Sequence, residues 1–203
     1  MIERKLAAVC IAFTLLALPG LGFANDSPGA AIVERLHGTL HTMMVEANTL
    51  GYDGRLTVIE PVLNETFDFA TISRIVTGRA WKDLDAGRRE NFVRLFGMLS
   101  AATYASNFSS YDGERFETLS TEEQRGSLLV KSVLIKRDGE RVTLDYVLRK
   151  RDDVWRIVNV IAQGVSDLSL KRADYTAVIK SEGFDSLIAK LNGKVASYGE
   201  SGR

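Results

Sequence analysis

The sequence predicts an α+β domain in which helices pack on one face of a curled antiparallel sheet of about four strands. Two observations predict this class. Apolar residues first recur at three- and four-residue steps, and between about residues 116 and 163 they alternate every two residues. The helical spacing then returns, so helices precede and follow the sheet. The 203 residues include 26 basic and 26 acidic side chains and are 45% hydrophobic, a composition that excludes a disordered chain and argues against a dedicated nucleic-acid binder.

Residues 1–24 have the features of a secretory signal peptide. A short charged start precedes the apolar run Leu6–Leu18, which is shorter than the roughly 20 residues that span a bilayer, and Gly22–Ala24 offers small residues for cleavage. The alternative is an uncleaved anchor. Cleavage would leave residues 25–203 as a single domain and remove Cys10, which excludes disulfides, thiolate metal sites and a cysteine nucleophile from the mature protein.

The first two helices are predicted from their boundary residues. A first helix begins after Ser27-Pro28 and ends at Gly51, because proline suits the first turn of a helix and glycine suits its end. A second helix, around Leu56–Thr66, contains Pro61. This proline should kink or divide the helix, since it lacks a backbone N–H and clashes with the preceding turn.

Two further helices should precede the sheet. Asp68 caps a short helix that stops at Gly78, because an aspartate accepts hydrogen bonds from the free N–H groups of a first turn and glycine tolerates the left-handed conformation beyond the last. Asp83 or Asp85 caps a longer helix. The apolar stripe of that helix consists of Phe92, Leu95, Phe96, Leu99, Ala102 and Thr103.

Four segments should form the sheet. The first, Phe116–Leu119, is weak, and the second, Leu128–Ile135, is apolar on both faces. A hairpin signal at Asp138-Gly139 leads into a third strand. That strand should turn Val142, Leu144, Tyr146 and Leu148 towards the helices. The last strand, Val154–Gln163, should turn Trp155, Ile157 and Ile161 to one side, and Val158 and Val160 to the other.

Two helices close the chain. One runs from about Leu168 to Glu182, and the other carries apolar residues from Leu187 to Val195. Gly183 separates them.

Few residues suggest catalysis or metal binding. His37 and His41 form half of a metal site, but no further His or Cys completes it, and no metal or cofactor is expected. Asp145 and Tyr146 are adjacent on a strand and so point to opposite faces. The sequence instead has more apolar surface than one packed face needs, which is either additional core or a ligand cavity. A small cavity enzyme acting on an apolar substrate, using Asp68, Asp145 or Tyr146, remains an alternative, as does an adaptor to a membrane complex.

Two separated strings resemble the MlaC family of periplasmic phospholipid-binding proteins, also called toluene-tolerance auxiliary components. One is Phe67–Trp81 (FDFATISRIVTGRAW), and the other is Trp155–Val160 (WRIVNV), followed by Gly164–Ser166. The resemblance covers roughly residues 30 to 195 in the family's order.

This chain departs from the phospholipid carriers at three positions. Asn159 stands where they usually have Asp, Asp167 where they have a hydrophobic residue, and Lys171 where they have Tyr. The segments Ser166–Leu168 and Glu182–Ile188 look more like the hopanoid-associated branch, HpnM.

The resemblance implies a monomeric, non-catalytic carrier that shuttles a hopanoid or phospholipid across a Gram-negative periplasm, between inner- and outer-membrane complexes. Its partners would be an inner-membrane lipid transporter or ABC complex. Buried methylenes would hold the lipid while the head group stays at the rim. The candidate cavity residues on the sheet side are Val133, Ile135, Tyr146, Leu148, Trp155 and Ile157. Those on the helical side are Ile72, Val76, Phe92, Phe96 and Leu99.

Overall fold

A computed structural model describes residues 27–201, and the predicted signal peptide with Cys10 lies outside the described residues. The described part confirms the α+β class. The helices are α1 (Pro28–Val45), α2 (Ala47–Thr66), α3 (Phe69–Thr77), the 3₁₀ helix η1 (Gly78–Asp83), α4 (Ala86–Asn107), α5 (Asp167–Glu182) and α6 (Phe184–Ser201). The strands are β1 (Arg115–Gln124), β2 (Ser127–Ile135), β3 (Arg141–Arg151), β4 (Val154–Ala162) and β5 (Val165–Ser166).

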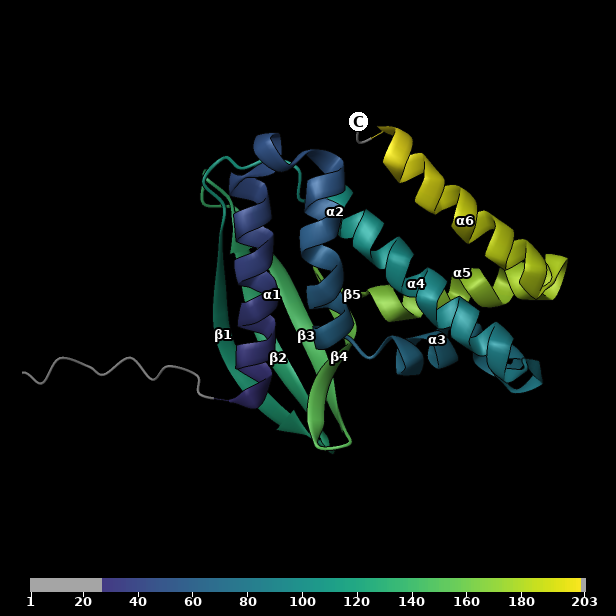
Figure 1. Ribbon diagram of the computed structural model, residues 1–203. Coiled ribbons are helices and arrows are strands. Elements are labelled where there is room, and N and C mark those ends of the chain that lie inside the picture. The colour runs from purple at the N-terminus through teal and green to yellow at the C-terminus, as the bar shows by residue number, and fades with distance from the viewer. Residues whose placement is uncertain (1–26, 202–203) are drawn as a thin grey trace, which may run out of the picture.

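The five strands form one antiparallel sheet in the order β1-β2-β3-β4-β5, each paired with the next along the chain. Figure 1 shows α1 and α2 side by side across one face of this sheet, with α3 to α6 gathered beyond β4 and β5. One core joins the two parts, because Leu148 of β3, Leu63 of α2 and Phe92 of α4 belong to the same buried cluster.

The predicted boundary between the first two helices is wrong. α1 ends at Val45, and α2 then starts at Ala47 and contains Gly51, whose φ of 59° and ψ of −173° break the helix. The buried Arg55 guanidinium ties this junction to α4 by donating to the carbonyl oxygens of Ala47 (3.1 Å) and Ala105 (2.8 Å). Glycine marks a break here, as expected, but the break lies inside α2.

Pro61 does not divide α2. The helix continues past it to Thr66, and the non-helical backbone lies at Gly51 instead. Pro61 is exposed, so water can satisfy the carbonyl group that its missing N–H leaves without a helical partner.

Local capping was predicted more accurately. The Asp68 carboxylate accepts from the Thr71 N–H at 2.9 Å at the start of α3, and α3 ends before Gly78, which has a φ of 61°. The Asp85 carboxylate accepts from the Arg88 N–H at 2.8 Å, so Asp85, and not Asp83, caps α4. Each cap depends only on residues within one turn, which is why the sequence suffices to find it.

The sheet contains more than the sequence predicted. β1 extends to Gln124, and the two-residue strand β5 was not foreseen. In β4, the register shifts so that Leu148 pairs with Ile157 while Val147 pairs with Asn159, which leaves Val158 as an extra residue. This bulge interrupts the alternation. The expectation that Ile161 shares a side with Trp155 and Ile157 is therefore wrong.

Candidate functional site

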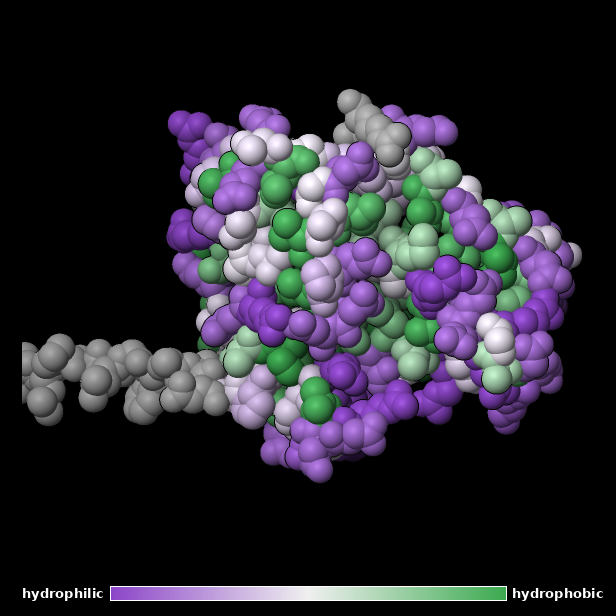
Figure 2. All heavy atoms as spheres, viewed as in Figure 1, coloured by the Kyte–Doolittle hydropathy of each residue, from purple (hydrophilic) through white to green (hydrophobic). Residues whose placement is uncertain are grey.

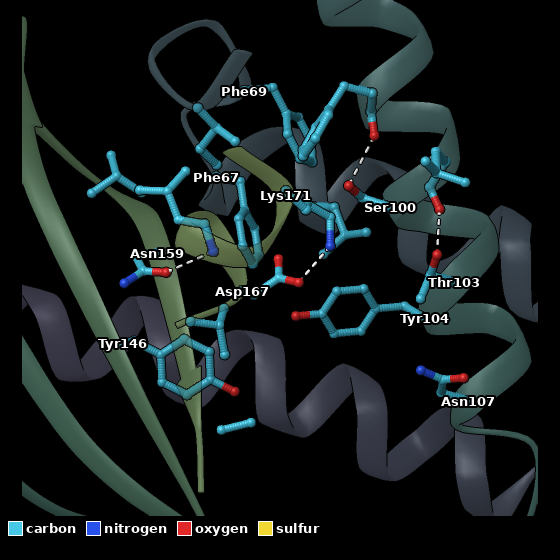
Figure 3. A pocket seen from close by; sticks show the side chains of 18 of the residues that line it. Phe67, Phe69, Ser100, Thr103, Tyr104, Asn107, Tyr146, Asn159, Asp167 and Lys171 are labelled. Atoms are coloured by element: carbon cyan, nitrogen blue, oxygen red, sulfur yellow. Dashed lines mark hydrogen bonds and ion pairs between the residues drawn. The ribbon is translucent and has the colours of Figure 1, made fainter. Parts of the chain in front are cut away.

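A cavity of about 410 Å³ lies between the sheet and the helices. Strands β3 and β4 form one wall, and α2 to α6, apart from η1, contribute the others (Figure 3). The apolar lining consists of Leu63, Phe67, Phe69, Ile72, Phe96, Leu99, Phe108, Leu144, Val158, Val160, Ala162 and Leu168. On the face in Figure 2, hydrophobic residues gather where α2 meets α4 and α6, within a largely hydrophilic surface.

Aromatic rings make up one continuous side of the cavity. Phe67 and Phe69 stack with ring centroids 5.6 Å apart, and Phe69 meets Phe96 at 6.0 Å. Phe67 is also hydrogen-bonded to α2 through its N–H and bridges to Ile157 of β4. Because backbone contacts hold Phe67 and its neighbour Asp68, this wall is attached to both the sheet and the helices.

Three tyrosines bring hydroxyl groups to the largely apolar cavity, and Tyr146 and Tyr175 are buried whereas Tyr104 is half-buried. They come from different elements: Tyr104 from α4, Tyr146 from β3 and Tyr175 from α5. Burial raises the pKa of each, with a further contribution to the Tyr104 pKa from the nearby Asp167 carboxylate. All three phenols therefore stay protonated near neutral pH and can donate a hydrogen bond, but they cannot serve there as bases.

His37 supports this wall from behind. A 3.0 Å hydrogen bond joins its Nε2 to the Tyr146 hydroxyl, and its ring stacks on Phe116 with centroids 4.3 Å apart. Burial lowers the pKa of His37 from 6.5 to about 4, so the ring is neutral at physiological pH. His41 meets Tyr111 edge-on instead. Within residues 27–201, no group of three or more His, Cys, Asp or Glu is placed to hold a metal ion.

Charged side chains surround the mouth of the cavity. We call them the mouth residues: Asp167, Lys171, Asp174 and Lys194. Lys171 forms an ion pair with Asp167 one turn earlier on α5, and Figure 3 shows both side chains directed into the cavity beside Tyr104. Asn159 lies next to this pair. Its side-chain oxygen accepts from the Leu168 N–H at 3.2 Å and from the Ser166 hydroxyl at 3.1 Å.

The structure places the predicted cavity residues in four different environments, the last of which is the outer face of the sheet. Ile72, Phe96, Leu99 and Tyr146 line the cavity. Four others are buried in the surrounding core: Val76, Phe92, Leu148 and Ile157. Trp155 is half-buried against the edge of that core. Helical and strand periodicity cannot separate the first group from the second, because both face inward.

Val133 and Ile135 do not lie where the sequence analysis put them. They pair with Thr143 and Arg141 on the sheet face that turns away from the helices. Both are nonetheless buried, with exposed fractions of 3% and 2%. Glu117 pairs with Val133 across the sheet and forms a 3.7 Å ion pair with Arg141, so long charged side chains neighbour this small apolar patch.

Several lining residues were missed. Phe67 and Phe69 stand out in the sequence only as part of a family motif, although they flank Asp68, the residue that caps α3. Leu144 was assigned to the correct face but not to the cavity. The mouth residues carried no periodic signal, since charged side chains at exposed positions look alike on every helix.

The MlaC protein family matches the chain over residues 36–193, well over half its length. The chain belongs to the MlaC family. The match runs from α1 into α6 and includes every cavity-lining residue except Lys194 and Tyr198. The recognition of the family from Phe67–Trp81 and Trp155–Val160 is confirmed. The assignment to the hopanoid-associated branch stays a prediction.

Two known proteins resemble this MlaC-family chain. The intermembrane phospholipid transport system binding protein MlaC of Haemophilus influenzae is 24% identical over 121 residues, which cover 57% of this chain and 56% of the relative. The chain thus spans about half the length of that curated relative. The phospholipid-binding protein from Ralstonia solanacearum, solved in complex with a phospholipid, superimposes with a TM-score of 0.74 at 18% identity, covering 85% of this chain and 99% of that one. This second likeness shows a shared fold.

Proposed function

We propose that this MlaC-family protein is a carrier that holds the apolar part of a lipid in the cavity between β3, β4 and the helices. The observation that carries the proposal is an apolar space edged by charged groups. Each methylene moved out of water is worth about 0.8 kcal/mol, so an aqueous carrier must replace most of the burial that a bilayer provides. The cavity volume of about 410 Å³ lies in the range of roughly 300–1,000 Å³ typical of ligand pockets.

The first candidate for the lipid is a phospholipid. Both similar proteins are named for phospholipid binding or transport, and a lipid phosphate would meet Lys194 or Lys171 at the mouth. A hopanoid is the second candidate. The observation favouring it is the polar replacement at Asp167 and Lys171, together with the similarity of Ser166–Leu168 to the hopanoid-associated branch.

We further propose that the carrier works in the periplasm as a single domain of residues 25–203, after cleavage of a signal peptide. No helix within residues 27–201 is both long and apolar enough to cross a membrane. A monomer of this kind would collect or deliver lipid at an inner-membrane transporter or ABC complex and at a partner in the outer membrane. Its affinity must remain close to that of the membranes, since a carrier that binds much more tightly cannot release its cargo.

The positions of the acidic residues favour a carrier over an enzyme. Asp145 pairs with Ile161 on the outer face of the sheet, so it cannot act together with Tyr146 in the cavity. Asp68 is engaged at the start of α3 and lies 3.6 Å from the Arg151 guanidinium. Neither Asp145 nor Asp68 therefore forms an acid–base pair with Tyr146 inside the cavity.

A transfer experiment tests this function. Donor vesicles containing a fluorescent phospholipid are mixed with acceptor vesicles, with and without the mature protein. We expect the protein to accelerate transfer and the lipid to be recovered with unchanged mass. Transfer no faster than in protein-free vesicles would contradict the proposed function as a phospholipid carrier. Recovery of a cleaved lipid would favour the alternative function as an enzyme.

A further inference from the structure

The cavity lining includes three polar or charged residues at the start of α5 and on the strand that contacts it. Asn159 comes from β4, whereas Asp167 and Lys171 come from the first two turns of α5. Nothing in the sequence alone places them together at a lipid site. Their common location makes this side of the cavity polar.

Hydrogen bonds to Asn159 hold the turn that carries Asp167. Asn159 accepts from the backbone N–H of Leu168, which belongs to the first turn of α5, and from the hydroxyl of Ser166, the residue that caps this helix. Asn159 is thus a positioning residue for the turn that carries Asp167. Asp167 in turn pairs with Lys171, so the first two charges at the mouth compensate each other.

The other two mouth residues are differently placed. Asp174 lies on α5 and Lys194 on α6, and these helices pack against each other. Neither side chain takes part in an ion pair among the described residues. The mouth therefore presents one uncompensated carboxylate and one uncompensated ammonium group, in addition to the internally neutral pair of Asp167 and Lys171.

We propose that the mouth selects lipids whose head group carries both a phosphate and an ammonium group over lipids whose head group is only anionic. This inference rests on the proposed lipid-carrier function. The phosphate is attracted to Lys194, and the ammonium group of the same head is attracted to Asp174. An anionic head with a neutral alcohol in place of the ammonium makes only the first contact and brings no positive charge to the uncompensated Asp174 carboxylate.

The test uses vesicles of equal parts phosphatidylethanolamine and phosphatidylglycerol, so that both lipids compete on one membrane surface. Delipidated protein is incubated with these vesicles and separated from them, and its bound lipids are quantified by mass spectrometry. We expect phosphatidylethanolamine to exceed phosphatidylglycerol by about threefold, the size of effect that one partly exposed ion pair provides.

Two substitutions separate the roles of the charges. Asp174→Asn should shift the ratio about two- to fivefold towards phosphatidylglycerol, because it removes the partner of the ammonium group. Lys194→Gln should lower the uptake of both lipids and leave their ratio unchanged, because both lipids contain the phosphate. The matched controls are Asp185→Asn and Lys190→Gln. These residues pair with Arg88 and Glu182 and do not line the cavity, so both amounts and ratio should stay as in the wild type.

Equal amounts of the two lipids on the wild-type protein would overturn the proposed selectivity while leaving the carrier function intact. A wild-type preference that Asp174→Asn does not alter would also overturn it. Uptake of neither lipid would contradict the carrier function for phospholipids itself, and would be distinguishable from the first result by the absence of any bound phospholipid.

Discussion

His37 links the first helix to the cavity wall through a single side-chain hydrogen bond. In the sequence, the spacing of this residue and His41 is that of half a metal site. In the structure His37 contacts Tyr146 and Phe116, whereas the His41 ring meets Tyr111. A spacing of four residues on a helix fixes only the face that two histidines share, and the partners of that face come from distant parts of the chain.

We predict that burial of His37 makes the stability of the protein depend on pH between about 4 and 6.5. The pKa of His37 is about 4 in the folded protein and 6.5 in an unfolded chain, so the unfolded chain binds more protons in this window. Stability should be complete above pH 6.5 and fall as the pH drops to 4. The loss reaches about 3 kcal/mol, since one pKa unit corresponds to roughly 1.4 kcal/mol.

Chemical denaturation of the wild type, His37→Gln and His41→Gln between pH 4 and 7 measures this effect. Glutamine keeps a group that can hydrogen-bond Tyr146 but cannot be protonated, so His37→Gln should lose less stability on acidification. His41→Gln should follow the wild type. Parallel curves for all three proteins would show that His37 is not responsible.

Residues whose role depends on near neighbours in the chain could be predicted from the sequence. Asp68, Gly78 and Asp85 end or begin helices as expected. Val133 could not be placed, because both faces of β2 are apolar and only the strands beside it decide which face meets the helices. The location of the mouth residues could not be predicted either, since their contacts involve β4, α5 and α6 together.

At the scale of elements, the end of α3 provides a sharp prediction about backbone conformation. Gly78 has a φ of 61°, and a Cβ at this position would lie 3.2 Å from the Thr176 side chain on α5. Gly78→Val should therefore lower the free energy of unfolding by about 1–3 kcal/mol through strain. Gly193→Ala is the matched control. Gly193 lies in α6 with nothing within 4 Å of an added Cβ, so alanine should stabilise by about 0.5–1 kcal/mol. Equal melting temperatures for both variants would contradict this explanation.

On one face of strand β3, some residues belong to the packed core and others line the cavity. Leu148 is fully buried in the core cluster, whereas Leu144, four residues earlier, lines the cavity. Leu148→Asp should unfold the protein, because burying a carboxylate costs several kcal/mol of a typical stability of about 5–15 kcal/mol. Leu144→Asp should remain folded, since its carboxylate can be hydrated in the empty cavity, but it should lose bound lipid.

Circular dichroism and lipid extraction on the same preparations distinguish the two substitutions. A folded Leu148→Asp protein, or a Leu144→Asp protein with normal lipid content, would show that the boundary between core and cavity lies elsewhere on β3.

The order of elements and most of their limits followed from the sequence, but the departures have non-local causes. The register shift at Val158 arises from pairing with β3, and the continuation of α2 through Pro61 depends on which side of the helix faces water. Strand β5 has only two residues and is defined by its partners Ile161 and Ala162. Periodicity describes a segment by itself and contains no information about these partners.

At the scale of the whole molecule, the cavity between the sheet and the helices is the proposed lipid site. Thr103 of α4 lines this cavity, and its hydroxyl donates to the Leu99 carbonyl at 2.8 Å. Thr57 of α2 makes the equivalent bond to the Asp53 carbonyl at 2.9 Å, but on the exposed side of its helix. Replacing either threonine by phenylalanine removes an equivalent hydrogen bond within a helix. Only Thr103→Phe also places a ring in the cavity.

Native mass spectrometry of the protein purified from the periplasm without added lipid is the most direct test. We predict that the wild type and Thr57→Phe carry a lipid of the same mass, and that Thr103→Phe is folded but largely free of lipid. A wild-type protein without lipid, or a Thr103→Phe protein with as much lipid as Thr57→Phe, would contradict the assignment of this cavity as the lipid site.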